Sequence, residues 1–351
     1  MKKFKRILLA ALAVLMVAGI LHAPSASAQS SSLSTTPRKD YVIEPGKSVN
    51  DKFSVRNLDT VNDLTLYLQV VDFTYSDDTG SAKFLLNQDA EPTPWSLKKY
   101  MTVPTTVSIG KGQSKSIDLN VKMPSNLGGG GYYSAILYST SAPSGGNLGL
   151  AASVATLVFV TVPGDAKEDL KLEKFGAYDP TAKKYNFIAV DEPKVLAFTL
   201  KNNGNVFEAP VGAINIKSMF GQEYKVDNVN PNKTLALIGQ SRTFQACIKL
   251  AAQQVDFQGN KSDATTCVSP GLWPGLYTAS ISLYYGQNGN VTQEIFKTIH
   301  FWYLPLWFII VAIVVILALA YVIWRTIVML RGGSFKIGGR PRTRKSSRRR
   351  R

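Results

Sequence analysis

Histidine, the side chain most often used for proton transfer near neutral pH, occurs only twice in this sequence. His22 follows an apolar N-terminal stretch, and His300 lies beside an apolar segment near the C-terminus. A mature chain that keeps His300 alone lacks the residues for Ser-His-Asp or Cys-His catalysis and for sites with several histidine ligands. We therefore expect no catalytic residue, no metal and no cofactor.

Carboxylates occur in adjacent pairs, at Asp77-Asp78, Glu168-Asp169 and Asp191-Glu192. Glycoside hydrolysis needs two carboxyl groups that converge in a cleft, whereas adjacent residues of a strand point to opposite faces. All three pairs lie beside turn residues, which favours solvated turns. A calcium site formed by Asp72, Asp77 and Asp78 stays open as an alternative, although the EF-hand spacing is absent.

The two cysteines, Cys247 and Cys267, bracket a polar stretch and are 20 positions apart. Two ligands do not complete a structural zinc site, which leaves a disulfide or two reduced thiols. We predict the disulfide, because both cysteines fall in the part of the chain expected to be exported.

The N-terminus predicts a signal peptide over residues 1–28. Four basic residues precede the uncharged stretch 7–21, and Ala26-Ser27-Ala28 fits a cleavage site before Gln29. An uncleaved signal anchor is the alternative. Residues 29–39 are polar and predict a flexible lead-in.

Residues 304–324 form a second apolar segment, 21 residues long without a charge. At about 1.5 Å per residue it covers about 31 Å, enough for a hydrocarbon core of about 30 Å. Trp302 and Tyr303 precede it and Trp324 ends it, as in the aromatic belts of membrane spans. We predict a transmembrane helix, the alternative being a buried core helix.

Basic residues after this segment predict its orientation. Residues 325–351 hold 11 Lys and Arg and no acidic residue, whereas the part between signal and span holds 25 basic and 24 acidic residues. Lys and Arg stay on the cytoplasmic side, so we expect a cell-membrane protein with the N-terminal part outside and the tail inside. Contact with anionic lipid explains the tail better than binding to nucleic acid, which we do not expect.

Between the apolar segments the pattern is that of an all-β protein. Apolar and polar residues alternate over 53–57, 64–70 and 116–121, separated by turn residues such as Pro45-Gly46. This pattern is typical of antiparallel β-sandwiches. We predict two of them, over 40–163 and 168–301, joined by the short linker 163–167.

Three short motifs recur in the same order, which indicates that the two sandwiches are repeats. FSVRN at 53–57 is echoed by FTLKN at 198–202, and GQSKSI at 112–117 by GQSRTF at 239–244. GYYSAI at 131–136 is echoed by GLYTAS at 275–280.

The motif order YVIEPGKS, FSVRN, GGYYSAI, LKNNGN and APVGAINI, set between a signal peptide and a membrane span, resembles the bacterial WxL-interacting-protein family. The resemblance implies tandem immunoglobulin-like domains outside the cell. It associates the first domain with peptidoglycan and the second with surface proteins that carry WxL modules. The segment between Cys247 and Cys267 departs from the family, and no ligand-binding residue can be carried over.

The function expected from these observations is non-enzymatic. A membrane-anchored surface protein would hold peptidoglycan, another surface protein or both through its two sandwiches, and would contact membrane lipid through its anchor and tail. The alternative is an assembly factor similar to a pilus chaperone, which lends an edge strand to a subunit. A cell-wall hydrolase is the least favoured hypothesis.

The charge pattern generates a direct test of topology. In intact cells, a cysteine introduced by Ser346→Cys should be shielded from membrane-impermeant thiol reagents, whereas one introduced by Ser144→Cys should react. Reaction at position 346 without permeabilisation would reverse the predicted orientation.

Overall fold

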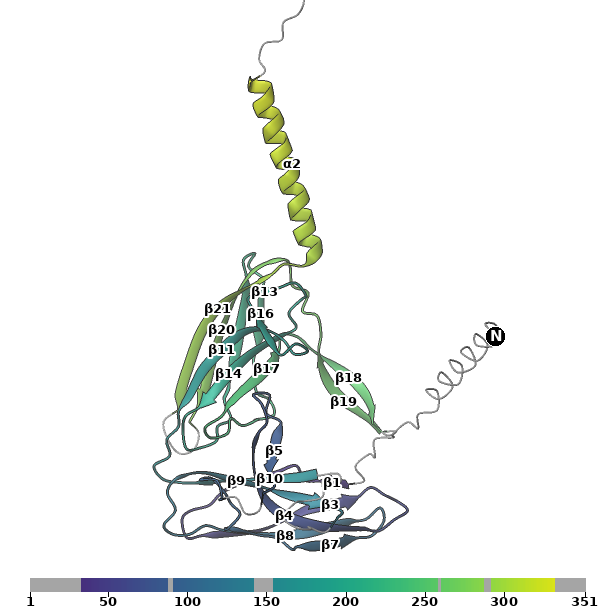
Figure 1. Ribbon diagram of the computed structural model, residues 1–351, viewed down its shortest axis with the longest axis vertical. Helices are drawn as coiled ribbons and strands as arrows, with labels where there is room; N and C mark the ends of the chain where they lie inside the picture. Colours follow the sequence, from purple (N-terminus) through teal and green to yellow (C-terminus); the bar gives the residue numbers. More distant parts are fainter. Residues whose placement is uncertain (1–32, 88–90, 142–153, 258–259, 287–291, 332–351) are drawn as a thin grey trace, which may run out of the picture. The chain divides into compact units, whose positions relative to one another are not determined.

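The computed structural model describes residues 33–87, 91–141, 154–257, 260–286 and 292–331 (Figure 1). The predicted signal peptide, its cleavage site between Ala28 and Gln29, and tail residues 332–351 lie outside these residues. Within them the chain is built of strands and one helix, which confirms the all-β prediction. The chain divides into two compact units, and each is described by itself. The first ends at Lys167, and the second begins at Glu168 and also includes Asp77–Gly80.

The first unit is a sandwich of two sheets. Its strands are β1 (Leu33–Thr35), β2 (Arg38–Val42), β3 (Ser48–Asn57), β4 (Leu64–Tyr75), β5 (Ala82–Leu85), β6 (Met101–Thr102), β7 (Thr106–Ile109), β8 (Ser114–Lys122), β9 (Gly130–Ser139) and β10 (Val154–Val162). One sheet has the order β1-β3-β8-β6, and the other has the order β2-β10-β9-β4-β5, with β7 also paired to β4. This is the strand order of an immunoglobulin-like sandwich.

The N-terminal segment of this unit belongs to both sheets. β1 pairs antiparallel with β3, whereas β2 pairs parallel with β10 over five residues. The prediction of a flexible lead-in over 29–39 is therefore wrong for Leu33–Thr35 and for Arg38 and Lys39, which lie in these strands. Main-chain hydrogen bonds to a distant strand order the segment, and its polar composition does not reveal them.

Alternating side chains fill the core of the first sandwich. Phe53, Val55, Ile117, Leu119 and Ile136 are among its buried residues. The segment 91–100 closes one end, where the Asp72 carboxylate accepts hydrogen bonds from Ser96 Oγ (2.7 Å) and Ser134 Oγ (2.8 Å). Asp72 is thus a structural residue that ties this segment to β4 and β9.

The second unit repeats this plan. Its strands are β11 (Leu170–Asp179), β12 (Lys184–Asn186), β13 (Ile188–Ala189), β14 (Val195–Asn202), β15 (Val211–Ser218), β16 (Glu223–Val226), β17 (Ser241–Cys247), β18 (Leu250–Phe257), β19 (Asn260–Cys267), β20 (Gly275–Tyr285) and β21 (Gln293–Tyr303). Its two main sheets have the orders β12-β11-β14-β17 and β13-β21-β20-β15-β16. As in the first unit, a short early strand, β13, pairs parallel with the last strand.

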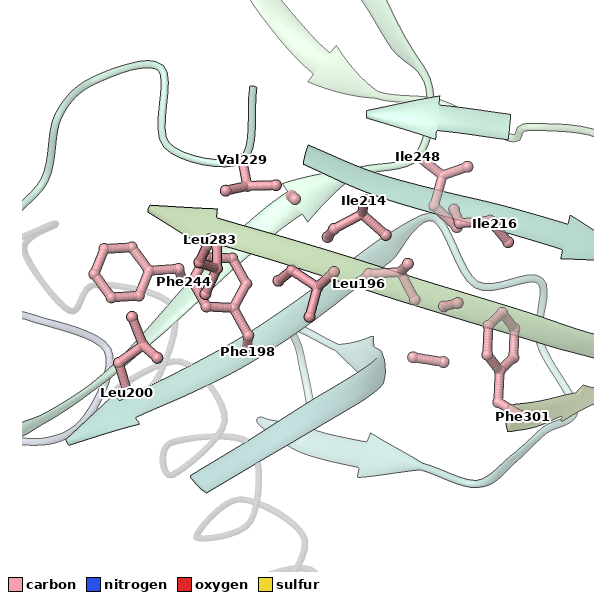
Figure 2. Packing of buried hydrophobic residues seen from close by; sticks show 14 of the residues in the cluster. Leu196, Phe198, Leu200, Ile214, Ile216, Val229, Phe244, Ile248, Leu283 and Phe301 are labelled. Atoms are coloured by element: carbon pink, nitrogen blue, oxygen red, sulfur yellow. The ribbon is translucent and has the colours of Figure 1, made fainter. Parts of the chain in front are cut away.

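The core of the second sandwich lies between these two sheets (Figure 2). Phe198 and Phe244 stack with their ring centroids 5.1 Å apart, and Leu196, Ile214 and Leu283 pack in the same cluster. Because successive side chains of a strand point to opposite faces of the sheet, every second residue of β20, from Tyr277 to Tyr285, lies in this core.

A buried asparagine occupies the same place in both repeats. Asn57 ends β3 and Asn202 ends β14, and both are fully buried. Asn202 Nδ2 donates to the carbonyls of Val206 (2.7 Å) and Ala236 (2.9 Å), and its Oδ1 accepts the Gly204 amide. Asn57 Nδ2 likewise donates to the Asn62 carbonyl and, at 3.3–3.4 Å, to those of residues 109 and 110.

The strands refine the repeat found in the sequence. Gly130 begins β9 and Gly275 begins β20, so Tyr277 corresponds to Tyr132 rather than to Tyr133. Both hydroxyls donate to the carbonyl four residues earlier, as in a tyrosine corner. The sequence alignment of GYYSAI with GLYTAS was wrong by one position, because the adjacent tyrosines of the first repeat face opposite sides of the strand.

Cys247 and Cys267 form the predicted disulfide. The polar stretch between them forms a hairpin of β18 and β19, paired from Leu250–Cys267 to Phe257–Asn260. The bridge therefore fastens the base of this hairpin to β17, an edge strand of the second sandwich.

The helix α2 (Leu306–Arg331) follows β21 after two residues. None of its side chains is buried, and the mean hydropathy of its most apolar 18-residue window is 3.2. Length and composition suffice to cross a membrane. The helix begins two residues later than predicted and continues seven residues beyond Trp324. Pro305 has no amide hydrogen, which suits a position at the start of a helix.

A polar cluster joins the two sheets of the first sandwich. Asp51 on β3 accepts hydrogen bonds from Lys39 Nζ (2.8 Å) and Tyr41 Oη (2.7 Å) on β2. These bonds, with the amide of Lys52, lower the pKa of the Asp51 carboxyl to about 2. Burial is the main cause that raises the pKa of the Tyr41 hydroxyl, and the hydrogen bond to Asp51 raises it further.

The asparagine pattern predicts a specific loss of stability. Asn202→Ala should lower the free energy of unfolding of the second unit by about 2–3 kcal/mol, because two buried carbonyls lose their donor. The measurement is hydrogen exchange of the full chain in detergent at increasing denaturant concentration. Exchange in peptides from β14 and β17 reports the stability of the second unit separately from that of the first. Asn232→Ala, at an exposed position of the same unit, should change the free energy of unfolding by less than about 0.5 kcal/mol. Equal effects would contradict the assignment.

Asp51 predicts an acid-sensitive contribution in the first unit. A carboxyl with a folded pKa of about 2 and an unfolded pKa of about 3.9 stabilises the fold above pH 4, and this stability is lost as the pH falls towards 2. Asp51→Asn should therefore remove part of the loss seen between pH 4 and 2 in unfolding midpoints. Asp118→Asn, on an exposed side chain, is the control. An unchanged acid transition in Asp51→Asn would refute the prediction.

Candidate binding surface at open sheet edges

The residues singled out for chemistry lie apart in the structure. His300 is exposed on β21, and its Nδ1 is 3.0 Å from Thr278 Oγ1. The pair Asp77-Asp78 lies in the turn between β4 and β5, where the Asp77 carboxylate accepts the amide and hydroxyl of Thr79. Such side chain-to-backbone bonds are typical of solvated turns.

The other two carboxylate pairs also lie in connections. Glu168-Asp169 precedes β11, and Asp191-Glu192 lies between β13 and β14. The Glu192 carboxylate accepts the Leu272 amide (2.6 Å) and the Ser269 hydroxyl. The described residues hold no group of three acidic, histidine or cysteine side chains placed to bind a metal. Asp72 is bonded to serine hydroxyls instead of joining Asp77 and Asp78.

The last strand of the second sandwich has a largely uncovered edge. β20 pairs with β21 on one side over its whole length, from Tyr303 to Gln293. On the other side, among the described residues, β13 pairs with Trp302 and Tyr303 alone. The corresponding strand of the first unit, β10, is covered by β2 over five residues. Nine residues of β21, 293–301, therefore form an edge without a neighbouring strand.

The hydrogen-bond pattern shows which groups face this edge. The Trp302 amide donates to the Phe187 carbonyl (2.8 Å), on the side away from β20. Because alternate residues of an antiparallel strand present both main-chain groups to the same side, Glu294, Phe296, Thr298 and His300 present theirs to the open edge. This spacing fits an added strand.

The outer face beside this edge is polar with one large apolar side chain. Thr298 Oγ1 lies 2.8 Å from Ser280 Oγ, and Phe296 is 64% exposed. By contrast, the opposite edge strand of this sheet, β16, carries Glu223 and Lys225, each in an ion pair. Charged side chains protect an edge from pairing. The 11 residues of β21 include two, Glu294 and Lys297, whereas the four residues of β16 include two.

The first unit has a smaller open edge next to a groove. β6 covers β8 only at Asn120 and Val121, so residues 114–119 have no strand on that side among the described residues. A groove of about 440 Å³ adjoins this edge and is lined in part by Asn50, Val103, Pro104 and Asn120. Asn120 Nδ2 donates to Asn50 Oδ1 (2.6 Å). Amide groups beside an apolar patch suit a polymer with both amide and apolar groups.

A larger hollow, about 770 Å³, lies in the second unit beside β13 and Cys267. Its acidic lining includes Asp179 and Glu192, and both carboxylates accept main-chain amides of nearby turns. Such carboxylates stabilise the loops that line the hollow.

Sequence reasoning located the strands but missed the open edge of β21 as a site. The spacing of Ile295, Ile299 and Phe301 predicts one buried face, and these three residues do pack in or against the core. Nothing in that alternation tells how far a partner strand covers the edge. The extent of the open edge is set by the length of β13, which has only two residues.

Comparison with known proteins finds similarity in solved structures alone, since no family model and no curated protein matches the sequence. The class 5 fimbriae chaperone CfaA is 14% identical over 76% of this chain and 98% of its own, with a TM-score of 0.34. The E. coli chaperone DraB is 12% identical over 76% and 96%, with a TM-score of 0.30. A structure of Salmonella enterica SafA pilin with the SafB chaperone matches at 9% identity over 77% and 96%, with a TM-score of 0.29. Likenesses this weak carry no argument about function.

Proposed function

We propose that this protein is a non-enzymatic binding protein, anchored in the cell membrane by α2 with both sandwiches outside, and that it holds an extended segment of another surface protein. The observation that supports the proposal is the open edge of β21, because no strand in the described part of the chain lies beside residues 293–301 on the side away from β20. An extended segment would pair with this edge as an additional strand.

Main-chain hydrogen bonds would supply much of the affinity. The four residues with outward-facing groups, Glu294, Phe296, Thr298 and His300, offer four donors and four acceptors. Each bond contributes about 0.5–1.5 kcal/mol net, so several acting together suffice for a moderate complex. Phe296 and the hydroxyl of Ser280 would provide side-chain selectivity.

The position of the edge suits a protein that keeps its partner near a membrane. β21 leads into α2 after Leu304 and Pro305. The first and last residues of β21 are 10 positions apart, and a strand rises by about 3.4 Å per residue. A segment bound to β21 would therefore lie within about 40 Å of the start of the helix. Orientation follows from the basic residues after the span.

Peptidoglycan binding by the first unit is a second candidate. The groove beside β8 supports it, because Asn50 and Asn120 offer amide groups that can bond the amides and hydroxyls of a wall polymer. An assembly factor would use strand pairing as well, but it would release its partner after delivery. A stable complex at the membrane would favour the anchored binding protein.

The strand-addition proposal predicts that Thr298→Pro abolishes binding and leaves the fold intact. Proline removes one amide that faces the open edge, and edge strands tolerate proline where the amide is not used in the sheet. Thr298→Ala removes the same side chain, keeps the amide and should bind like the unchanged chain. Lys297→Pro should unfold the second unit, because that amide faces β20.

The measurement is pull-down by the full chain in detergent from solubilised surface proteins, with purified wall sacculi in parallel. Thr298→Pro should reduce capture at least tenfold, and 0.5 M salt should remove little, since the Debye length there is about 4–5 Å. Capture by Thr298→Pro equal to Thr298→Ala would refute strand addition. Equal retention of all variants on sacculi would favour the wall-binding candidate, and a fall in sacculus turbidity would contradict a non-enzymatic role.

A further inference from the structure

Six apolar side chains are exposed on three connections of the second unit. They lie in β13 and directly beside it, in the turn between β15 and β16, and just before β20: Phe187, Ile188, Val190, Met219, Phe220 and Trp273. We call this set the apolar rim. Phe187, Phe220 and Trp273 are 64%, 68% and 63% exposed.

Main-chain bonds fix the first part of the rim beside the start of α2. Ile188 pairs with Trp302, and the Trp302 amide donates to the Phe187 carbonyl. The Leu304 amide donates to the Ala189 carbonyl at 2.9 Å. Since α2 begins at Leu306, this segment is bonded to the last two positions before the connection to the helix.

The second part of the rim lies at the same end of the sheet. Gly275 pairs with Tyr303, and the Met219 amide donates to the Leu276 carbonyl (2.9 Å). A Cβ at Gly275 would lie 3.1 Å from Met219 Sδ and 3.3 Å from Phe220 Cε2. Trp273 is two residues from Gly275. The three connections thus lie where β21 ends, as Figure 1 shows for β13 and β16.

Such a group of apolar side chains needs a partner other than water, because exposed apolar clusters mark interaction sites. Continuity with α2 identifies that partner. A two-residue connection leaves the end of β21 close to the headgroup region, where tryptophan and phenylalanine are favoured. A second copy of the chain would have to reach this end of the sandwich between the protein and the bilayer.

We infer that the apolar rim inserts into the interfacial region of the bilayer that α2 crosses. The inference rests on the proposed membrane anchoring. The second unit would then contact lipid at three connections in addition to the helix, and its tilt would be restricted. A restricted tilt holds the open edge of β21 at a constant height above the lipid.

The test uses the full chain in phosphatidylcholine–phosphatidylglycerol vesicles with an environment-sensitive fluorophore on single introduced cysteines. Phe220→Cys and Phe187→Cys report two parts of the rim. Thr292→Cys, exposed at the far end of β21, is the matched control about 35–40 Å away along the strand. Val315→Cys lies in α2 and reports anchoring independently. The native cysteines stay bridged and unreactive.

Lipid carrying a doxyl quencher near the headgroup should quench both rim labels at least threefold more than the Thr292 label. A deep quencher should quench the Val315 label. If the Val315 label is not quenched, the membrane anchor itself is refuted. If it is quenched while the rim labels behave like the Thr292 label, the rim inference alone is overturned. Blue-shifted rim labels that lipid quenchers do not reach would place protein on the rim and also overturn it.

Discussion

Both sandwiches depend on a buried asparagine at the end of an inner strand. Asn57 and Asn202 donate to carbonyls of the connection that follows their strand and of the segment leading to β8 or β17. A buried carbonyl without a donor is costly, so one amide organises two connections at once. The turns Gly112-Gln113 and Gly239-Gln240 begin β8 and β17 at positive φ glycines in both units. The repeat of short sequence motifs therefore reflects a repeated hydrogen-bond network.

The same plan yields different edges in the two units. In the first, β2 covers β10 over five residues, whereas in the second, β13 covers β21 over two. The second unit also carries the disulfide-fastened hairpin of β18 and β19 beyond its edge strand β17. The two units share the plan of the core and the asparagine network, and they differ in the connections at the sheet edges. Function is expected where the copies differ, because the shared residues are occupied in packing and in main-chain bonds.

The open edge and α2 lie on consecutive segments of the chain, and part of the apolar rim is bonded to the end of β21. β21 provides the edge, its last residues bond the segment with Phe187 and Ile188, and α2 begins three residues after Tyr303. An edge strand is an association hazard in a protein free in solution. In the proposed arrangement, with α2 in the membrane and the apolar rim in lipid, the same edge would be available to partners that approach along the surface.

Local patterns in the sequence were enough to predict the strands, the helix and the disulfide. Alternation of apolar side chains identified the strands, an uncharged run of 21 residues identified the helix, and cysteine number and context identified the bridge between Cys247 and Cys267, because each is a local property of residue type and spacing. Tertiary structure alone decided the pairing of Leu33–Thr35, the burial of Asp72 and the open edge of β21. It also gathered Phe187, Phe220 and Trp273 at one end. These features depend on which distant segments lie beside each strand. The alternation of apolar and polar residues shows which face of the sheet a side chain occupies, but it does not show which strand, if any, pairs with the edge.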